Sequence, residues 1–212
     1  MRIRSFVFAL ALGATSTACA SPTTIEHVWR SPEWPGSFTH IVIFGMSKRA
    51  GVRRDFEERM AHAFAEVGVR ATPSYRLFPH ERELRDEDIA RVLAERGANG
   101  SLVARLVAVN QQYYYFPGSP YLMLGGPRYG FYGHYHGAYA MMYSPGYLVE
   151  YNIVTIETNL YDVATSELVW SGLSDTFDPK NIEDAIESYS RTMVETLLDS
   201  GLVTPTMIER RD

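Results

Sequence analysis

The sequence predicts an α/β fold of the α+β type, in which three helices cover one mixed sheet of about five strands. From residue 38 onward, short β-branched runs alternate with amphipathic helical stretches. Two alternating runs then follow each other directly, which is typical of an antiparallel hairpin. The chain has 212 residues, 46% of them hydrophobic and 21% charged, and is long enough for one such domain with a sizeable core.

Residues 1–18 are predicted to be a signal peptide. Arg2 and Arg4 precede an apolar run over 6–14, and small residues follow it. The run is shorter than the roughly 20 apolar residues that a membrane-spanning helix needs. This segment is therefore expected to export the chain.

Two cleavage sites compete around Cys19, the only cysteine in the chain. Residues 16–19 resemble a bacterial lipobox, whose cysteine receives a diacylglycerol and becomes the first residue. Residues 18–20 also fit the A-x-A pattern of ordinary signal peptidase, which would cut before Ser21. We favour lipidation, because the position of a lone cysteine directly after an apolar run explains it as an acyl acceptor. By resemblance to lipoprotein sorting rules, Ala20 then favours the outer membrane, with the protein facing the periplasm.

Residues 19–37 are predicted to be the lipidated cysteine and a tether, because the segment contains three prolines and several Ser and Thr residues. Trp29 and Trp34 also lie in it. Two tryptophans in a free linker would leave a large apolar area exposed, so at least one is expected to pack on the domain. The single α/β domain is then expected to span 38–212.

The first half of the domain is predicted to be β-α-β-α. A buried strand over 38–45 precedes a helix whose apolar residues recur at intervals of three and four over 52–67. The charged residues over 53–59 are interpreted as the solvated face of this helix. A second strand over 69–75 contains a proline and is therefore expected either to lie at an edge of the sheet or to end at that proline. Asp86 is the predicted N-cap of the next helix.

The second half is predicted to be β-β-β-α. The run over 100–111 is nearly all apolar and is expected to be a central strand. Alternating runs over 149–163 and 167–177 are expected to form the hairpin. Asp178 and Pro179 are the expected N-cap and first residue of a final amphipathic helix.

This order resembles uncharacterised bacterial envelope lipoproteins related to the amino-terminal domain of TolB and the soluble domain of the curli secretion channel. The resemblance rests on the strand HIVIFGMS, the helix RRDFEERMAHAF and the hairpin ETNLYDVATSELVWSG with its terminal helix. It covers roughly residues 38–203 and consists of fold-level signals without catalytic content. It implies an envelope assembly or accessory factor that acts by binding, and it carries over no secretion-pore role.

A Tyr/Gly-rich insertion is predicted over 113–147. Tyrosine combines a flat apolar face with a hydroxyl group and has few rotatable bonds, which suits the recognition of sugars, peptides or a membrane interface. An insertion of this length equally suits a segment that packs on its own domain or stays mobile. Deletion of 117–145 would separate the two. The candidate contact residues are Tyr113, Tyr114, Tyr115, Tyr121, Tyr129, Tyr132, Tyr135, Tyr139, Tyr143 and Tyr147.

Two further motifs carry weaker hypotheses. His134 and His136 could present two imidazoles to Zn or Cu, but no third ligand is evident, so neither a metal nor another cofactor is expected. Residues 45–51 lie between a predicted strand and a helix N-terminus, where backbone N–H groups and basic side chains can hold an anion. The segment lacks the GK[ST] element of a nucleotide P-loop, so an ordinary solvated connection is the favoured interpretation.

No catalytic residue is predicted, because the chain contains no GxSxG or HExxH motif. A formal net charge of −5 argues against nucleic acid as a partner. The leading hypothesis is a lipid-anchored envelope protein that binds an envelope protein or a glycan as an accessory factor. One alternative is an envelope hydrolase or transferase, which would require polar residues converging in a pocket near Ser47. Another is a secreted, self-associating structural domain.

Overall fold

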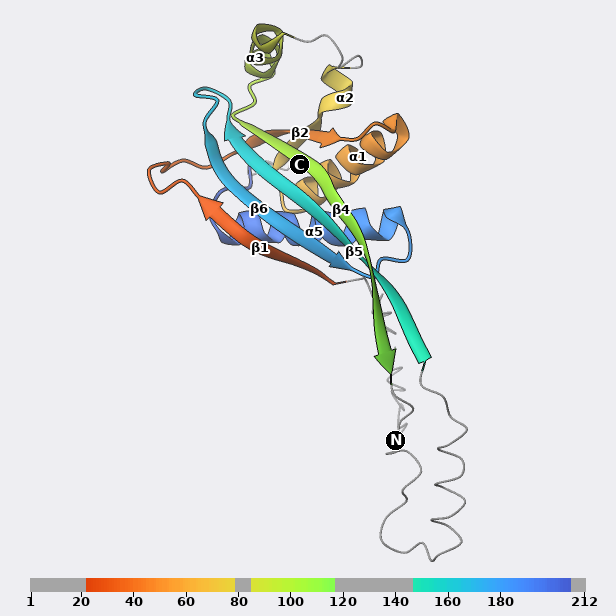
Figure 1. Cartoon of the computed structure of the whole chain (residues 1–212). Coiled ribbons are helices and arrows are strands. Elements are labelled where there is room, and N and C mark those ends of the chain that lie inside the picture. The colour runs from red at the N-terminus through yellow and green to blue at the C-terminus, as the bar shows by residue number, and fades with distance from the viewer. Residues whose placement is uncertain (1–21, 79–84, 117–146, 207–212) are drawn as a thin grey trace, which may run out of the picture.

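The computed structural model describes residues 22–78, 85–116 and 147–206, and in these ranges it confirms the predicted fold class. Six strands form one mixed sheet in the order β1-β6-β5-β4-β2-β3 (Figure 1). Parallel pairing joins β2 to β3 and to β4, and the other neighbours are antiparallel. The strands are β1 Thr23–Arg30, β2 His40–Met46, β3 Arg70–Pro73, β4 Gly100–Phe116, β5 Tyr147–Asp162 and β6 Leu168–Phe177.

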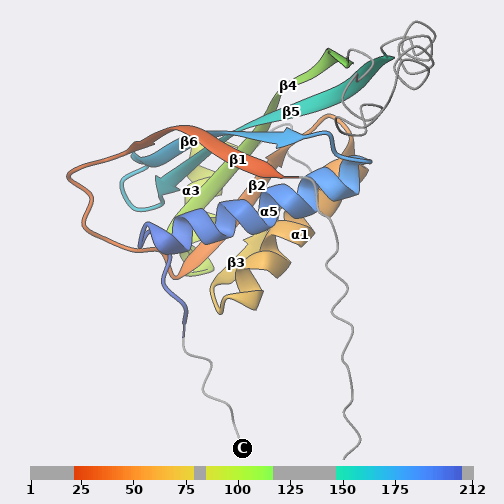
Figure 2. The same cartoon turned by 90° about the horizontal axis from the view of Figure 1, so that it is seen from below.

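Helices α1 (Ala50–Glu66) and α5 (Ile182–Asp199) cover one face of the sheet (Figure 2). Ile41 and Ile43 of β2 contribute to the core beneath them, together with fully buried residues of both helices. Val42 and Phe44 of the same strand belong to a second, smaller cluster that packs on the opposite face. Their alternation follows from the two-residue period of a strand.

The second cluster lies under helices α2 (Ser74–Leu77) and α3 (Asp86–Glu95). Leu93 of α3 and Phe78 after α2 are its largest side chains besides Phe44. No described helix covers the front of β5 and β6 in Figure 1. The two sides of the sheet are therefore covered unequally, and the main core lies on the α1/α5 side.

The predicted tether over 19–37 is wrong for its central part, because Thr23–Arg30 forms the edge strand β1. It pairs antiparallel with β6 from Thr23 opposite Thr176 to Arg30 opposite Trp170. Local composition failed here because the partner strand lies near the other end of the chain and supplies the backbone hydrogen bonds. The expectation for the tryptophans is confirmed, since the ring of Trp34 stacks on Phe38 with 4.5 Å between centroids.

The predicted caps of two helices are also wrong. Helix α3 begins at Asp86, so Arg85 is its N-cap and uses no side-chain hydrogen bond. Helix α5 is capped by Asn181, whose Oδ1 accepts a hydrogen bond from Asp184 N at 2.8 Å. Asp178 instead has a positive φ of 44°, and its Oδ1 accepts from Asn152 N. The cap positions were misassigned because several Asp and Asn residues compete for them in the sequence.

The strand predicted over 69–75 is β3, which ends two residues early at Pro73 because α2 begins at Ser74. Its edge position is confirmed, because β3 pairs only with β2 among the described strands. The central position of β4 and the hairpin of β5 with β6 are confirmed as well.

His40 at the start of β2 makes folding stability dependent on pH. It is buried, and its Nε2 lies 2.9 Å from Thr72 Oγ1. Burial and the charge of Arg70 lower its pKa below the ordinary 6.5, although backbone hydrogen bonds at Gly97 and Arg96 oppose this. A lowered pKa in the folded state means that the unfolded chain binds the proton more strongly.

We therefore expect the free energy of unfolding contributed by His40 to be fully present above pH 6.5 and to be lost as the pH falls through the lowered pKa. Urea unfolding of the wild type and of His40→Gln from about pH 7.5 to 5 measures this. The wild type should lose more stability than the variant over this range. Equal slopes of stability against pH would show that His40 does not titrate in the unfolding equilibrium.

Candidate functional site

Three features meet at one end of the sheet. The first is the far part of the β4/β5 hairpin, which projects beyond the other strands (Figures 1 and 2). Strand β2 accompanies β4 only to Arg105, and β6 accompanies β5 only to Ile153. Among the described strands, none therefore lies beside the six pairs from Gln111 opposite Asn152 to Phe116 opposite Tyr147. At about 3.3 Å per residue, they extend roughly 20 Å beyond the sheet.

This projecting stem, defined as 111–116 with 147–152, is rich in exposed aromatic and apolar side chains. Tyr113 and Tyr147 are each 62% exposed, and Leu148 is 66% exposed. Glu150 is its only charged residue. At the base of the stem, Tyr151 packs against Phe177 with 4.6 Å between ring centroids and donates a hydrogen bond to Gln112 Oε1. The stem thus presents a nearly uncharged aromatic surface on a regular backbone.

The predicted boundary of the insertion shifts accordingly, because both of its ends lie in paired strands. Four of the ten candidate tyrosines, at 113, 114, 115 and 147, belong to the stem. The other six, at 121, 129, 132, 135, 139 and 143, lie outside the described residues, as do Cys19, His134 and His136. The described residues contain no group of three or more side chains suited to a metal ion.

The second feature is the entry of the chain into the sheet. Pro22 O accepts a hydrogen bond from Phe177 N at 2.9 Å, at the end of β6 next to the base of the stem. Thr23 Oγ1 lies 2.7 Å from Ser188 Oγ of α5 and 2.9 Å from Thr176 Oγ1, which fixes this point on the domain. Pro22 is the third residue after Cys19, so the Cα atoms of these two residues lie at most about 11 Å apart. A group attached to Cys19 is therefore confined to the end of the domain that carries the stem.

The third feature is a cavity of about 720 Å³ between the sheet and the first turns of α1 and α5, here called the end cavity. Its walls include Leu106 and Val109 of β4, Val154 and Ile156 of β5, and Ile182 of α5. A β-bulge between Leu106 and Ala108 adds one residue to β4. This keeps Leu106 and Val109 on the same face of the sheet although they are three residues apart.

Cations gather at one side of the end cavity, in the loop that joins β2 to α1 and in the first turn of α1. Lys48, Arg49 and Arg53 line it, together with Ser47, and its lining contains no Asp, Glu, His or Cys among the described residues. Ser47 Oγ accepts from Arg49 N at 3.2 Å. Arg49 is the N-cap of α1 but makes no side-chain cap, and the first turn of the helix holds no acidic residue. The local field therefore favours an anion.

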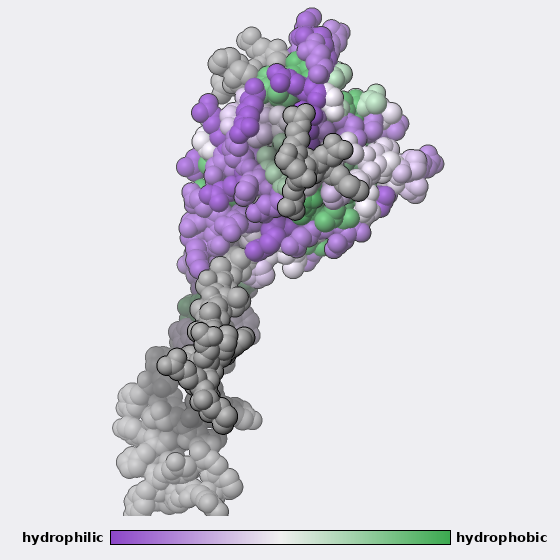
Figure 3. All heavy atoms as spheres, turned by 180° about the vertical axis from the view of Figure 1, so that it is seen from behind, coloured by the Kyte–Doolittle hydropathy of each residue, from purple (hydrophilic) through white to green (hydrophobic). Residues whose placement is uncertain are grey.

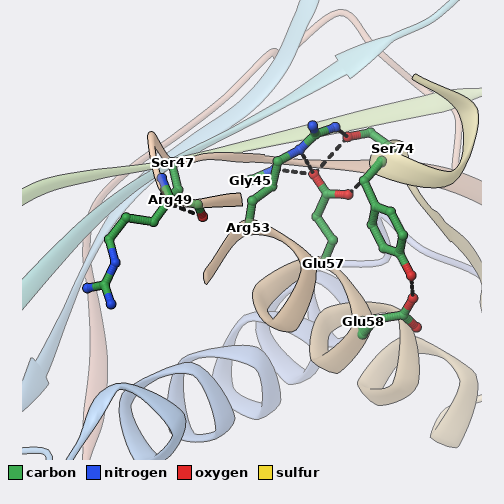
Figure 4. A network of polar contacts seen from close by, with 8 residues as sticks. Gly45, Ser47, Arg49, Arg53, Glu57, Glu58 and Ser74 are labelled. Carbon is green, nitrogen blue, oxygen red and sulfur yellow. Dashed lines mark hydrogen bonds and ion pairs between the residues drawn. The ribbon is translucent and has the colours of Figure 1, made fainter. Parts of the chain in front are cut away.

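Behind this loop, Arg53 and Glu57 form a buried ion pair, so the prediction that the charges over 53–59 all lie on the solvated face is wrong for these two residues (Figure 4). Glu57 Oε1 accepts from Arg53 Nε at 3.0 Å, from Gly45 N at 3.0 Å and from Ser74 Oγ at 2.7 Å. Its Oε2 accepts from Tyr75 N at 2.8 Å. The network joins the end of β2 to α1 and α2.

The sequence did contain a signal for this network. Residues 53, 57, 60 and 64 are spaced by four, three and four, so Arg53 and Glu57 lie on the same helical face as buried Met60 and Phe64. Figure 4 shows Arg49 pointing away from the network. Arg53 is thus tied to the fold, whereas the side chains of Lys48 and Arg49 form no described ion pair.

A second carboxylate on α1, Glu58, lies nearer the surface. It accepts hydrogen bonds from Tyr75 Oη and from Arg76, with Arg76 Nη2 at 2.7 Å from both carboxylate oxygens. Burial would raise the pKa of Glu58, but the hydrogen bonds from Tyr75 and Arg76 and the charge of Arg76 outweigh burial and lower it. Glu58 is therefore an ionised structural partner at neutral pH and does not line the end cavity.

No family model matches the chain, and no curated protein matches it. Similar solved structures include two of the PelC dodecamer from Paraburkholderia phytofirmans. The first, a variant with one leucine replaced by methionine, is 11% identical with a TM-score of 0.44 and covers 82% of this chain and 98% of that chain. The second is 10% identical with a TM-score of 0.43 and covers 86% of this chain and 99% of that chain.

The lipoprotein GNA1162 from Neisseria meningitidis is 11% identical, with a TM-score of 0.40 over 76% of this chain and 99% of that chain. At these identities and TM-scores the similarities carry no argument about function. The resemblance to TolB and the curli channel stays a prediction. Within the described ranges, no helix has the length and hydropathy needed to cross a membrane.

Figure 3 shows the rear of the molecule as mostly hydrophilic, with hydrophobic residues gathered in limited patches. The pocket near Ser47 that the enzyme alternative requires is present, and its polar lining consists of the Ser47 hydroxyl, the cations Lys48, Arg49 and Arg53, and the amides Asn152 and Asn181. The lining is therefore suited to holding a ligand.

Proposed function

We propose that this chain is a lipid-anchored protein of the bacterial envelope that acts by binding, with the projecting stem as its contact surface. The observation that carries the proposal is the position of Pro22, which precedes β1 at the same end of the sheet as the stem. An acyl group on Cys19 would hold this end of the domain toward the membrane. The stem would then reach the bilayer surface or whatever lies upon it.

The chemistry of the stem suits this position. Tyrosine side chains place an apolar ring and a polar hydroxyl at a boundary between apolar and aqueous surroundings. The stem has one charged residue in twelve, so little desolvation of charge opposes a contact. Regular strand pairing orders its backbone before binding, which reduces the conformational entropy lost in the complex.

The anchor is tested by the intact mass of the mature N-terminus, recovered from membrane and soluble fractions of a bacterial host. We expect a chain that begins at acylated Cys19 in the membrane fraction. A free chain that begins at Ser21 would disprove the anchor. It would leave a diffusible protein whose stem is not directed toward the membrane.

The contact surface is tested separately, with the stem variant Tyr113→Ser/Tyr115→Ser/Tyr147→Ser. Exposed strand positions tolerate such changes, so the fold should persist, as circular dichroism can verify. We expect the variant to lose crosslinks to envelope components in intact cells. The matched control, Tyr161→Ser, alters a tyrosine of the same strand as Tyr147 at the opposite end of the sheet. Equal crosslinking of both variants would exclude the stem as the contact.

A further inference from the structure

We propose that the end cavity binds a single-chain anionic amphiphile of the fatty-acid type. Its alkyl chain would lie between the sheet and the first turns of α1 and α5, and its head group would lie at Lys48 and Arg49. This inference goes beyond the proposed function and does not depend on an acyl group at Cys19. It rests on the cavity's shape, its apolar walls and the sign of its charged lining.

The walls expose apolar area that folding alone does not bury. Met46, Leu106, Val109 and Ile182 line the cavity and are 46%, 53%, 56% and 45% exposed. They come from β2, β4 and α5, so they converge only in the folded chain. Exposed apolar residues scattered singly need no explanation, but a concave group of them marks a ligand or interaction site. The cavity's volume of about 720 Å³ lies within the range of small-ligand sites.

The charged lining selects the head group. The chain as a whole is acidic, with 25 acidic against 20 basic residues, yet the cavity is lined by three cations and no described carboxylate. Arg53 is committed to Glu57, which leaves Lys48 and Arg49 to face a ligand. Both are exposed, and they flank the start of α1, whose first turn has neither a side-chain cap nor an acid. A carboxylate placed there would meet two positive side chains and uncapped backbone N–H groups.

Apolar walls and a cationic mouth together fit an amphiphile better than either a simple anion or a neutral hydrocarbon. A small anion would leave the walls exposed to water, and a neutral hydrocarbon would make no use of the cations. A single alkyl chain with a terminal carboxylate satisfies both parts at once. Its apolar part gains from burial, and its head group remains near solvent at the mouth.

The test is photo-crosslinking of the purified mature protein, held in phosphatidylcholine nanodiscs, with a dodecanoate analogue that carries a diazirine at its alkyl end. We expect mass spectrometry to find the label on peptides containing Leu106 to Val109 and Ile182 to Ile186. Unlabelled dodecanoate should compete, and dodecanol should compete about tenfold less well because it lacks the charge. Label spread evenly over the exposed surface would overturn the proposal.

Two pairs of variants separate the walls from the mouth. Leu106→Trp fills the cavity and should abolish specific labelling. Its control is Val107→Trp, because Val107 is similarly exposed but does not line the cavity. This control should leave the labelling unchanged. Lys48→Gln/Arg49→Gln should weaken competition by dodecanoate about tenfold and leave that by dodecanol unchanged. The charge-matched control Arg96→Gln/Arg191→Gln should change neither. Ile182→Trp repeats the wall test if Leu106→Trp does not fold.

A second copy of this chain is the competing occupant. In that case light scattering would show a stable oligomer that Leu106→Trp dissociates, and dodecanoate would not label the cavity. That result would overturn the proposal. The proposal is supported if the dodecanoate analogue labels the cavity and if the wild type and Leu106→Trp have the same oligomeric state.

Discussion

Glu57→Gln is expected to lower the free energy of unfolding by about 3–5 kcal/mol, because it removes the buried negative charge that pairs with Arg53 and weakens the hydrogen bonds that this carboxylate accepts. Glu57 is fully buried and accepts four hydrogen bonds, including one from Arg53 Nε and one from Gly45 N. Glutamine keeps the shape but offers one acceptor oxygen in place of two. Urea unfolding monitored by tryptophan fluorescence measures the loss.

The matched control is Asp55→Asn on the same helix. Asp55 pairs with Arg59 at 2.9 Å with the same four-residue spacing as Arg53 and Glu57, but its side chain is 38% exposed. An exposed pair of this kind contributes less than about 1 kcal/mol. Comparable losses in the two variants would mean that burial does not set the strength of the Arg53–Glu57 pair.

Trp170→Ala is expected to cost about 3–5 kcal/mol of stability through the cavity that it leaves in the main core. Trp170 of β6 is 1% exposed and pairs across the strands with Leu160 and Arg30. Its ring lies so close to Gly172 that a Cβ there would stand 2.6 Å from it. The neighbouring backbone thus packs directly on the indole, and little of the vacated volume can close.

Trp29→Ala provides the comparison for the same change of residue at a surface position. Trp29 lies on the edge strand β1 and is 47% exposed, so its truncation should cost less than about 1 kcal/mol. Thermal unfolding of both variants reads the difference directly. A larger loss from Trp29→Ala than from Trp170→Ala would contradict the assignment of Trp170 to the core.

The elements with a strong period were predictable from the chain alone. The apolar stripe of α1 and the alternation in β5 and β6 arise from neighbours three, four or two residues apart, so local sequence records them. The nearly continuous apolar run that begins at Gly100 identified β4 as a central strand, because such a run is typical of a strand that is covered on both faces of the sheet. The aromatic stretch after it was predicted as an insertion over 113–147, whereas its two ends belong to paired strands that continue to Phe116 and resume at Tyr147.

Pairing between distant residues decided the rest. Thr23–Arg30 forms a strand because β6 offers it a partner. The bulge after Leu106 turns Val109 toward the helices. Buried Glu57 joins α1 to Gly45 and Ser74. The end cavity exists only because β2, β4, β5, α1 and α5 meet there. None of these arrangements leaves a periodic pattern in a short stretch of sequence. Each depends on which surfaces face each other once backbone groups are paired and apolar area is buried.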